Sequence, residues 1–251
     1  MKAAFVVLAG LLFASSGARA DEGDELGFVP PAPGTYVLQH ILRAPEGTVL
    51  EPDGKQSRLS RFTTGRITLL SLVYTSCSDG RGCPLASHLL RQLRGRIGKD
   101  EKLSARLRLV TMSFDPDHDT PEVMRAYADG YLSEGSGPPW LFLTTRSRRE
   151  LLPVLRGFGQ DVWIATSGAA NPGGKLPHLL KAFLIDRDGW IREIYTTSFM
   201  QPQMVLNDMN TLLLEEVCNR DRARPSRRRS DRSGENPAEA VAARDSPSRR
   251  E

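Results

Sequence analysis

The fold of this chain is decided by the stretch Val73-Tyr-Thr-Ser-Cys77-Ser-Asp-Gly-Arg-Gly-Cys83-Pro84. The apolar run that leads into it, Ile67–Val73, predicts a strand buried on both faces of a sheet. The pattern that follows it, Leu85–Ile97, has leucines at helical spacing, and Pro84 suits the first turn of a helix. A buried strand, a loop with two cysteines and a helix form an arrangement in which α/β proteins place redox or soft-metal chemistry.

The surroundings of Cys83 favour its ionised form. Cys83 is at the start of the predicted helix, where the helix dipole is positive, and Arg81 is two residues away. Both effects stabilise a thiolate, so the sequence predicts a lowered pKa for Cys83. The thiolate is the form of cysteine that attacks disulfides and binds soft metals.

The spacing of Cys77 and Cys83 leaves three interpretations open. Their C-x5-C pattern is not the C-x-x-C of a dithiol oxidoreductase, yet five intervening residues can still close a disulfide. Gly80 and Gly82 supply the backbone freedom that a tight loop needs, and the same freedom could direct both sulfurs to one metal ion. A structural disulfide, a metal-binding pair and a redox pair all fit this spacing.

The composition fits one domain with polar extensions. The chain has 251 residues, 39% of them hydrophobic, and a formal charge of +4. Residues 219–251 contain ten Arg against six Asp or Glu, so the whole excess lies in this tail. The charge therefore does not predict a nucleic-acid-binding surface on the domain. The tail has almost no apolar residues and is expected to be disordered, with at most weak contact with a membrane surface.

The beginning of the chain predicts export. Residues 1–20 have a positive start, an apolar stretch at Ala3–Ala14 and an Ala18-Arg-Ala20 cleavage site, which together are typical of a secretory signal. The apolar stretch is too short for a spanning helix, so a cleaved periplasmic protein is expected rather than an anchored one. Residues 21–34 are expected to be a flexible lead-in. An oxidising compartment permits a Cys77–Cys83 disulfide and leaves Cys218 as the odd cysteine.

The order of predicted elements between residues 35 and 218 indicates a single α/β domain. Strands are predicted at Thr35–Ile41, Ile67–Tyr74, Leu107–Phe114, Trp140–Thr144, Ala182–Ile185 and Trp190–Tyr195, and helices at Leu85–Ile97, Glu122–Tyr131, after Ser147 and at Pro202–Val217. A Pro-Asp-Gly turn after Thr48 predicts an extra N-terminal hairpin. The economical fold is a thioredoxin-like sandwich, a central mixed sheet flanked by helices.

A possible third member of the cysteine site is His178. It follows a long glycine-rich segment, Gly157–Pro177, and a loop of that length in a compact domain usually has a function. It also precedes the strand predicted at Lys181–Asp186, and in a thioredoxin-like sheet such a loop can lie beside the first strand-to-helix junction. A lone histidine beside a strand is more often structural, but two thiolates and one imidazole form a donor set that suits copper.

Three sequence motifs resemble one known family. They are Tyr74-Thr-Ser-Cys77…Cys83-Pro84, Phe114-Asp-Pro-Asp-His-Asp-Thr-Pro-Glu122, and His178 followed by Phe-Leu-Ile-Asp-Arg-Asp-Gly189. From roughly Thr35 to Leu214 the chain resembles the Sco/SenC family. The resemblance implies a thioredoxin-like domain that binds one copper ion through Cys77, Cys83 and His178. It also implies a metallochaperone that delivers copper to the binuclear copper site of cytochrome oxidase subunit II, or reduces the cysteines of that site.

Two features depart from the pattern of that family. Its cysteine loop normally has three residues between the cysteines, whereas this chain has five between Cys77 and Cys83. Its usual membrane anchor is replaced here by the cleavable signal predicted in residues 1–20. The longer loop is expected to leave metal ligation possible while changing its geometry, affinity and redox potential.

The sequence therefore favours an exported, monomeric copper chaperone without enzymatic turnover, whose partner is cytochrome oxidase subunit II or another exported copper protein. An alternative is a thiol–disulfide oxidoreductase in which Cys77 and Cys83 are the redox pair and His178 tunes a thiolate. A weaker alternative is a copper or redox sensor. No sequence feature predicts a nucleic-acid partner.

Other chemically capable residues have simpler interpretations. Asp115 and Asp119 are expected to serve turns and helix caps, because prolines and a threonine surround them. His88 and His118 are expected at the surface. The methionines of the last helix fit a packed core better than a thioether site for copper; they are Met204 and Met209.

Overall fold

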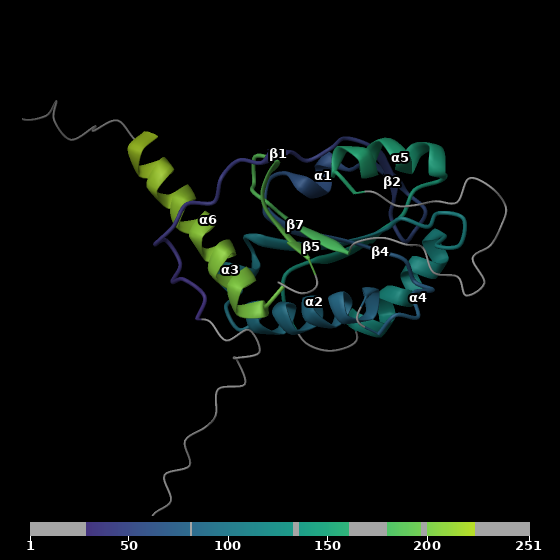
Figure 1. Cartoon of the computed structure of the whole chain (residues 1–251), viewed down its shortest axis with the longest axis horizontal. Coiled ribbons are helices and arrows are strands. Elements are labelled where there is room, and N and C mark those ends of the chain that lie inside the picture. The colour runs from purple at the N-terminus through teal and green to yellow at the C-terminus, as the bar shows by residue number, and fades with distance from the viewer. Residues whose placement is uncertain (1–28, 81, 133–135, 161–179, 197–199, 224–251) are drawn as a thin grey trace, which may run out of the picture. The chain divides into compact units, whose positions relative to one another are not determined.

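The run Ile67–Val73 forms β4, a central strand of a six-stranded sheet in the computed structural model of the chain (Figure 1). All seven residues of β4 are buried. β4 is parallel to β5 (Leu107–Ser113) and antiparallel to β7 (Lys181–Ile185), so the sheet is mixed, as predicted. The structure describes residues 29–80, 82–132, 136–160, 180–196 and 200–223, and the elements lie in one compact unit, residues 31–251.

The remaining strands complete the sheet and form a separate hairpin. The sheet order is β1-β8-β7-β4-β5-β6, with β1 at Leu42–Arg43, β8 at Trp190–Thr196 and β6 at Trp140–Leu143. The hairpin pairs β2, Thr48–Leu50, with β3, Gln56–Arg58, around the predicted Pro-Asp-Gly turn. The expectation of an extra N-terminal hairpin is thereby confirmed.

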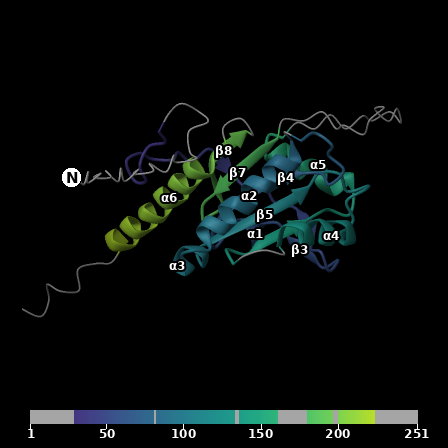
Figure 2. The ribbon, with the colours of Figure 1, turned by 90° about the horizontal axis from the view of Figure 1, so that it is seen from below.

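Helices cover both faces of the sheet. They are α1 (Ser60–Thr63), α2 (Cys83–Ile97), α3 (Glu101–Ser104), α4 (Pro121–Leu132), α5 (Arg148–Gly157) and α6 (Pro202–Ala223). α2 lies between α4 and α6 on one face, while α1 and α5 lie on the other (Figures 1 and 2). This arrangement is the predicted thioredoxin-like sandwich.

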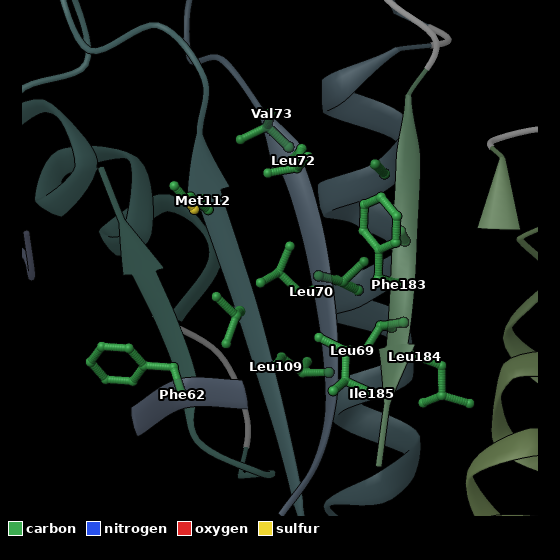
Figure 3. Close-up of a cluster of buried hydrophobic side chains, with 14 of the residues drawn as sticks. Phe62, Leu69, Leu70, Leu72, Val73, Leu109, Met112, Phe183, Leu184 and Ile185 are labelled. Atoms are coloured by element: carbon green, nitrogen blue, oxygen red, sulfur yellow. The ribbon is translucent and has the colours of Figure 1, made fainter. Parts of the chain in front are cut away.

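The core is built from the apolar side chains of the three central strands. Leu69 and Leu70 of β4, Leu109 of β5 and Phe183 of β7 are completely buried (Figure 3). Burial of a side chain of this size stabilises the folded state by about 2 kcal/mol relative to leaving the side chain exposed. β4 is therefore a firm base for the cysteine loop, which follows it directly.

The prediction of a first strand at Thr35–Ile41 is wrong. Only Leu42–Arg43 pairs with β8, and Val37 and Ile41 are exposed. The carbonyl of Leu38, which a strand would use in a ladder, instead accepts hydrogen bonds from the guanidinium of Arg192. The alternation of apolar residues in this segment therefore does not reflect a buried sheet face.

α6 is longer than the predicted helix, which ended at Val217. It continues to Ala223, so the first five residues of the expected tail are helical. Arg220 and Arg222 lie in its last turn, where positive charge interacts favourably with the helix dipole. The rest of the tail, the signal and most of the lead-in lie outside the described residues. Among the residues that are described, no helix combines the length and apolar character needed to cross a membrane.

Candidate metal centre

The cysteine loop begins where β4 ends and finishes at the start of α2. Gly82 is the residue that caps α2, and Cys83 is the first residue of the helix. Two backbone hydrogen bonds fold the loop: the N–H of Cys77 donates to the carbonyl of Tyr74 at 3.3 Å, and the N–H of Gly82 donates to Asp79 at 2.8 Å. Cys83 is buried and Cys77 is half-buried, so one sulfur faces the interior while the other is accessible.

The sulfur of Cys77 is surrounded by hydrogen-bond donors. It interacts with the backbone N–H groups of Cys83 and Asp79, the side chain of Tyr74 and the thiol of Cys83. A Cβ atom placed on Gly82 would lie only 3.3 Å from this sulfur. Gly82 has a φ of −96°, so the close approach of the sulfur, and not a left-handed backbone, is what favours glycine at this position. The loop thus brings the two cysteine sulfurs together as free thiols.

The same contacts move the two thiol pKa values in opposite directions. Burial raises the pKa of Cys77, but the hydrogen bonds from the Cys83 backbone and the Tyr74 side chain outweigh it, and the net pKa is lowered. Burial raises the pKa of Cys83, and the nearby charge of Cys77 raises it further. The predicted lowering of the Cys83 pKa is therefore wrong: the start of the helix stabilises the thiolate of Cys77. Arg81, the other reason for that prediction, lies outside the described residues.

This difference predicts the order in which the two cysteines react with an alkylating reagent. Only a thiolate reacts, so the rate for Cys77 should rise with pH through a lowered pKa, below the value of about 8.5 for an ordinary thiol. Cys83 should react only at higher pH, because its pKa is raised and its sulfur is buried. Iodoacetamide labelling of the reduced chain across pH, with mass-spectrometric mapping of each cysteine, measures both profiles.

The denatured chain is the control for this experiment. In denaturant the contacts that separate the two pKa values are lost, so Cys77 and Cys83 should be labelled over the same pH range. If Cys83 of the folded chain is labelled at lower pH than Cys77, the assignment of the reactive thiolate is refuted.

A buried carboxylate joins the cysteine loop to the neighbouring strand. Asp119 is fully buried, and it accepts hydrogen bonds from the backbone N–H of Thr75 at 3.1 Å, from the hydroxyl of Thr75 and from the hydroxyl of Ser113. Thr75 follows β4, and Ser113 is the last residue of β5. Asp119 does more than the turn-and-cap role expected from the sequence, because its carboxylate holds the chain in place two residues before Cys77. The signal in the sequence was the aspartate-rich motif Phe114–Glu122, which follows β5, the strand beside β4.

The other candidates lie where the sequence placed them. His88 and His118 are exposed; His118 contacts the carboxylate of Asp115 at 2.8 Å, and this hydrogen bond raises the pKa of His118. Met209 is buried and Met204 packs against the core, which confirms a packing role for both. The third cysteine, Cys218, is exposed on α6.

The predicted ligand His178 lies outside the described residues, as does the segment 161–179. Among the residues that the structure describes, no group of three or more His, Cys, Asp or Glu side chains could hold a metal ion. The structure thus brings Cys77 and Cys83 together, and the third ligand stays a prediction.

The comparisons with known proteins identify the family. The model for the family described as SCO1/SenC matches residues 48–214, about two-thirds of the chain. The chain belongs to the SCO1/SenC family. The matched region contains the cysteine loop, Asp119 and His178, while the predicted signal and the arginine-rich tail lie outside it. No curated protein matches the chain.

Solved structures similar to this SCO1/SenC member share its fold at low sequence identity. Copper-bound ScoI of Arabidopsis thaliana is 17% identical, with a TM-score of 0.57, and the match covers 69% of this chain and 99% of that one. Copper-bound ScoI of Bradyrhizobium japonicum is 20% identical, with a TM-score of 0.52 and coverage of 67% and 98%. Apo Sco1 of Thermus thermophilus is 24% identical, with a TM-score of 0.56 and coverage of 71% and 95%. These similarities confirm the thioredoxin-like fold.

Proposed function

We propose that this SCO1/SenC member is an exported metallochaperone that holds one copper ion between Cys77, Cys83 and His178. The observation that carries the proposal is the meeting of two free sulfurs in the loop after β4. The copper-bound ScoI structures from Arabidopsis thaliana and Bradyrhizobium japonicum, which have the same fold, support it.

The two sulfurs fit copper chemically. Cu(I) prefers soft thiolate donors, and the lowered pKa of Cys77 makes one thiolate readily available. Cys83 holds its proton more strongly, so it must release that proton before it can bind the metal. Because Cys77 is half-buried rather than enclosed, thiolates of a partner can approach it, and copper can move by exchange of ligands.

The strand order supports His178 as the third ligand. β7 begins at Lys181, three residues after His178, and it pairs with β4 so that Ala182 lies opposite Ser71. The start of β7 is therefore at the same edge of the sheet as the cysteine loop. Three residues of chain span at most about 10 Å, which limits how far His178 can be from this edge.

The partner we propose is an exported copper protein, with the binuclear copper site of cytochrome oxidase subunit II as the first candidate. Removal of residues 1–20 after export would leave a periplasmic monomer. This assignment follows from the SCO1/SenC family and from the signal in the sequence.

Copper stoichiometry of the full-length chain tests the proposal. The reduced chain, given Cu(I) under anaerobic conditions with a competing chelator, is expected to retain one copper ion per chain. The same chain with both loop thiols alkylated, or oxidised to a Cys77–Cys83 disulfide, is expected to retain none, since only thiolates bind the metal. Tight binding of one copper by the alkylated chain would place the metal elsewhere.

A second function, thiol–disulfide exchange, is favoured by the asymmetry of the two cysteines. The thiolate of Cys77 would attack a disulfide of the partner, forming a mixed disulfide and releasing one partner thiolate. Cys83, after losing its proton, would then attack the sulfur of Cys77 and release the second partner thiolate. The partner gains two electrons, and the Cys77–Cys83 pair loses two in forming its own disulfide.

The state of the acceptor separates the two functions. The copper-binding domain of subunit II can be offered with its cysteines oxidised and no copper present, or with its cysteines reduced and the chain loaded with copper. Reduction in the first experiment indicates an oxidoreductase, whereas copper transfer in the second indicates a metallochaperone. A chain that does neither refutes this partner.

A further inference from the structure

Four arginines line a cleft at the edge of the sheet where β4 and β5 begin. The cleft has a volume of about 270 Å³. Its arginines come from four separate segments: Arg66 precedes β4, Arg106 precedes β5, Arg187 lies in the turn between β7 and β8, and Arg220 lies on α6. The fold, rather than a run of basic sequence, gathers these charges.

The cleft contains more positive charge than its own carboxylates balance. Among the residues that the structure describes, Glu216 is the one acidic side chain of the cleft; it forms an ion pair with Arg106, and the side chain of Arg220 donates to the backbone carbonyl of Glu216 at 3.3 Å. Within the described part of the chain, the side chains of Arg66 and Arg187 have no hydrogen-bond or ion-pair partner. Counted over these described residues, four arginines and one glutamate leave an excess of three positive charges.

The backbone around the cleft holds these charges in place. The N–H of Gly65 donates to the carbonyl of Arg187 at 2.7 Å, which joins the segment before β4 to the turn between β7 and β8. Arg108 lies close by, with its guanidinium donating to the carbonyls of Arg61 and Thr64. Burial lowers the pKa of Arg108, and the charge of Arg66 lowers it further, so the region is under like-charge repulsion. A bound anion would relieve that repulsion.

We propose that this arginine cleft, formed by Arg66, Arg106, Arg187 and Arg220, binds a phosphate group. The planar guanidinium forms paired hydrogen bonds that match the oxygens of phosphate, and several such groups from different directions suit a group with more than one negative charge. The phosphate is that of a free ion such as pyrophosphate or that of a lipid headgroup. The chemistry of recognition is the same for both sources.

The position of the cleft leaves the copper site unobstructed. Arg66 immediately precedes β4, and the cysteine loop immediately follows it. Seven residues of strand separate the two ends by about 23 Å. A ligand in the cleft would therefore leave Cys77 and Cys83 accessible, and the two sites should bind independently.

A pair of charge-matched variants tests the proposal in the full-length chain. The test variant carries Arg66→Gln and Arg187→Gln. Within the described structure the side chains of Arg66 and Arg187 have no hydrogen-bond or ion-pair partner, so the substitutions break no such contact. The control variant carries Arg149→Gln and Arg156→Gln, two exposed arginines of α5 outside the cleft. The test and control variants each lose two positive charges and keep the arginine-rich tail. Nonspecific attraction to anions should therefore fall equally in both.

Two probes separate the sources of phosphate. Calorimetric titration with pyrophosphate measures binding of a free ion, and flotation with phosphatidylglycerol-containing vesicles, compared with phosphatidylcholine vesicles, measures binding of a lipid headgroup. In one of these assays the test variant should bind at least about tenfold more weakly than the control variant, since hydrogen bonds from two charged groups are lost. The assay that shows the difference identifies the source.

Copper stoichiometry of the same variants completes the experiment. Both variants should hold as much copper as the unmodified chain, which shows that they are folded and that the two sites are independent. Equal binding by the test and control variants in both phosphate assays would overturn the proposal. A failure of copper binding in every variant would refute the proposed function while leaving this inference to be decided by the phosphate assays.

Discussion

Replacing Cys77 with serine is expected to weaken copper binding by more than about 100-fold, because loss of a group that only orients a ligand already costs 10- to 100-fold. Serine is close in size but offers a hard oxygen donor that stays protonated, whereas Cu(I) prefers a soft thiolate. Cys83→Ser should have a similar effect, because it removes the second sulfur. Competition for Cu(I) with a chelator of known affinity measures the change.

Cys218→Ser is the matched control for these variants. Cys218 is exposed on α6, so its replacement should leave both the affinity and the stoichiometry unchanged. A Cys77→Ser chain that still binds one copper ion as tightly as this control would reject the cysteine loop as the metal site. Near-UV and far-UV circular dichroism of each variant shows whether the fold is retained.

The same competition assay tests the third ligand. His178→Ala should weaken binding while leaving the cysteines able to react, because the proposed site loses its imidazole and keeps its two sulfurs. His118→Ala is the control, since His118 is exposed and hydrogen-bonded to Asp115. Equal affinity of the two histidine variants would remove His178 from the proposed site.

The centre of the fold was predictable because its signals are local and strong. The mainly apolar run of β4 favours burial on both faces, and the leucines at helical spacing that follow Pro84 indicate where α2 packs. The loop between these two elements therefore had to lie at the edge of the sheet. The pairing of Cys77 with Cys83 follows from that arrangement.

The electrostatics of the loop were not predictable in the same way. Proximity to the start of α2 indicated a thiolate at Cys83, but the pKa depends on which sulfur is buried and which receives the N–H donors. The sequence does not show that the backbone of Cys83 donates to Cys77, nor that the Cys83 thiol is enclosed. The role of Asp119 was missed for a related reason, because its donor Thr75 is 44 residues away in sequence.

Removal of the Asp119 carboxylate is expected to destabilise the fold by about 3 kcal/mol and to weaken copper binding as well. In Asp119→Ala, the N–H and hydroxyl of Thr75 and the hydroxyl of Ser113 lose their shared acceptor. A buried donor left without an acceptor costs about 1–3 kcal/mol. Guanidinium unfolding of the copper-free, reduced chain measures the loss of stability, and the Cu(I) competition assay measures the loss of affinity.

The loss of stability and the loss of copper affinity in Asp119→Ala have one physical cause. Thr75 is two residues before Cys77, and its hydrogen bonds to Asp119 fix the point at which the chain leaves β4. Without them the loop should sample more conformations, and the sulfur of Cys77 should spend less time among its donors. The pKa of Cys77 should therefore return toward that of an ordinary thiol, and its labelling should shift to higher pH.

Asp117→Ala is the control for Asp119→Ala. Asp117 belongs to the same sequence motif, but its carboxylate is exposed and pairs with Arg148 at 2.6 Å on the surface. A surface ion pair contributes about 1 kcal/mol or less, so this variant should keep nearly normal stability, labelling and copper affinity. If Asp119→Ala lowers stability but leaves the pH profile of Cys77 unchanged, Asp119 supports the fold without positioning the cysteine loop.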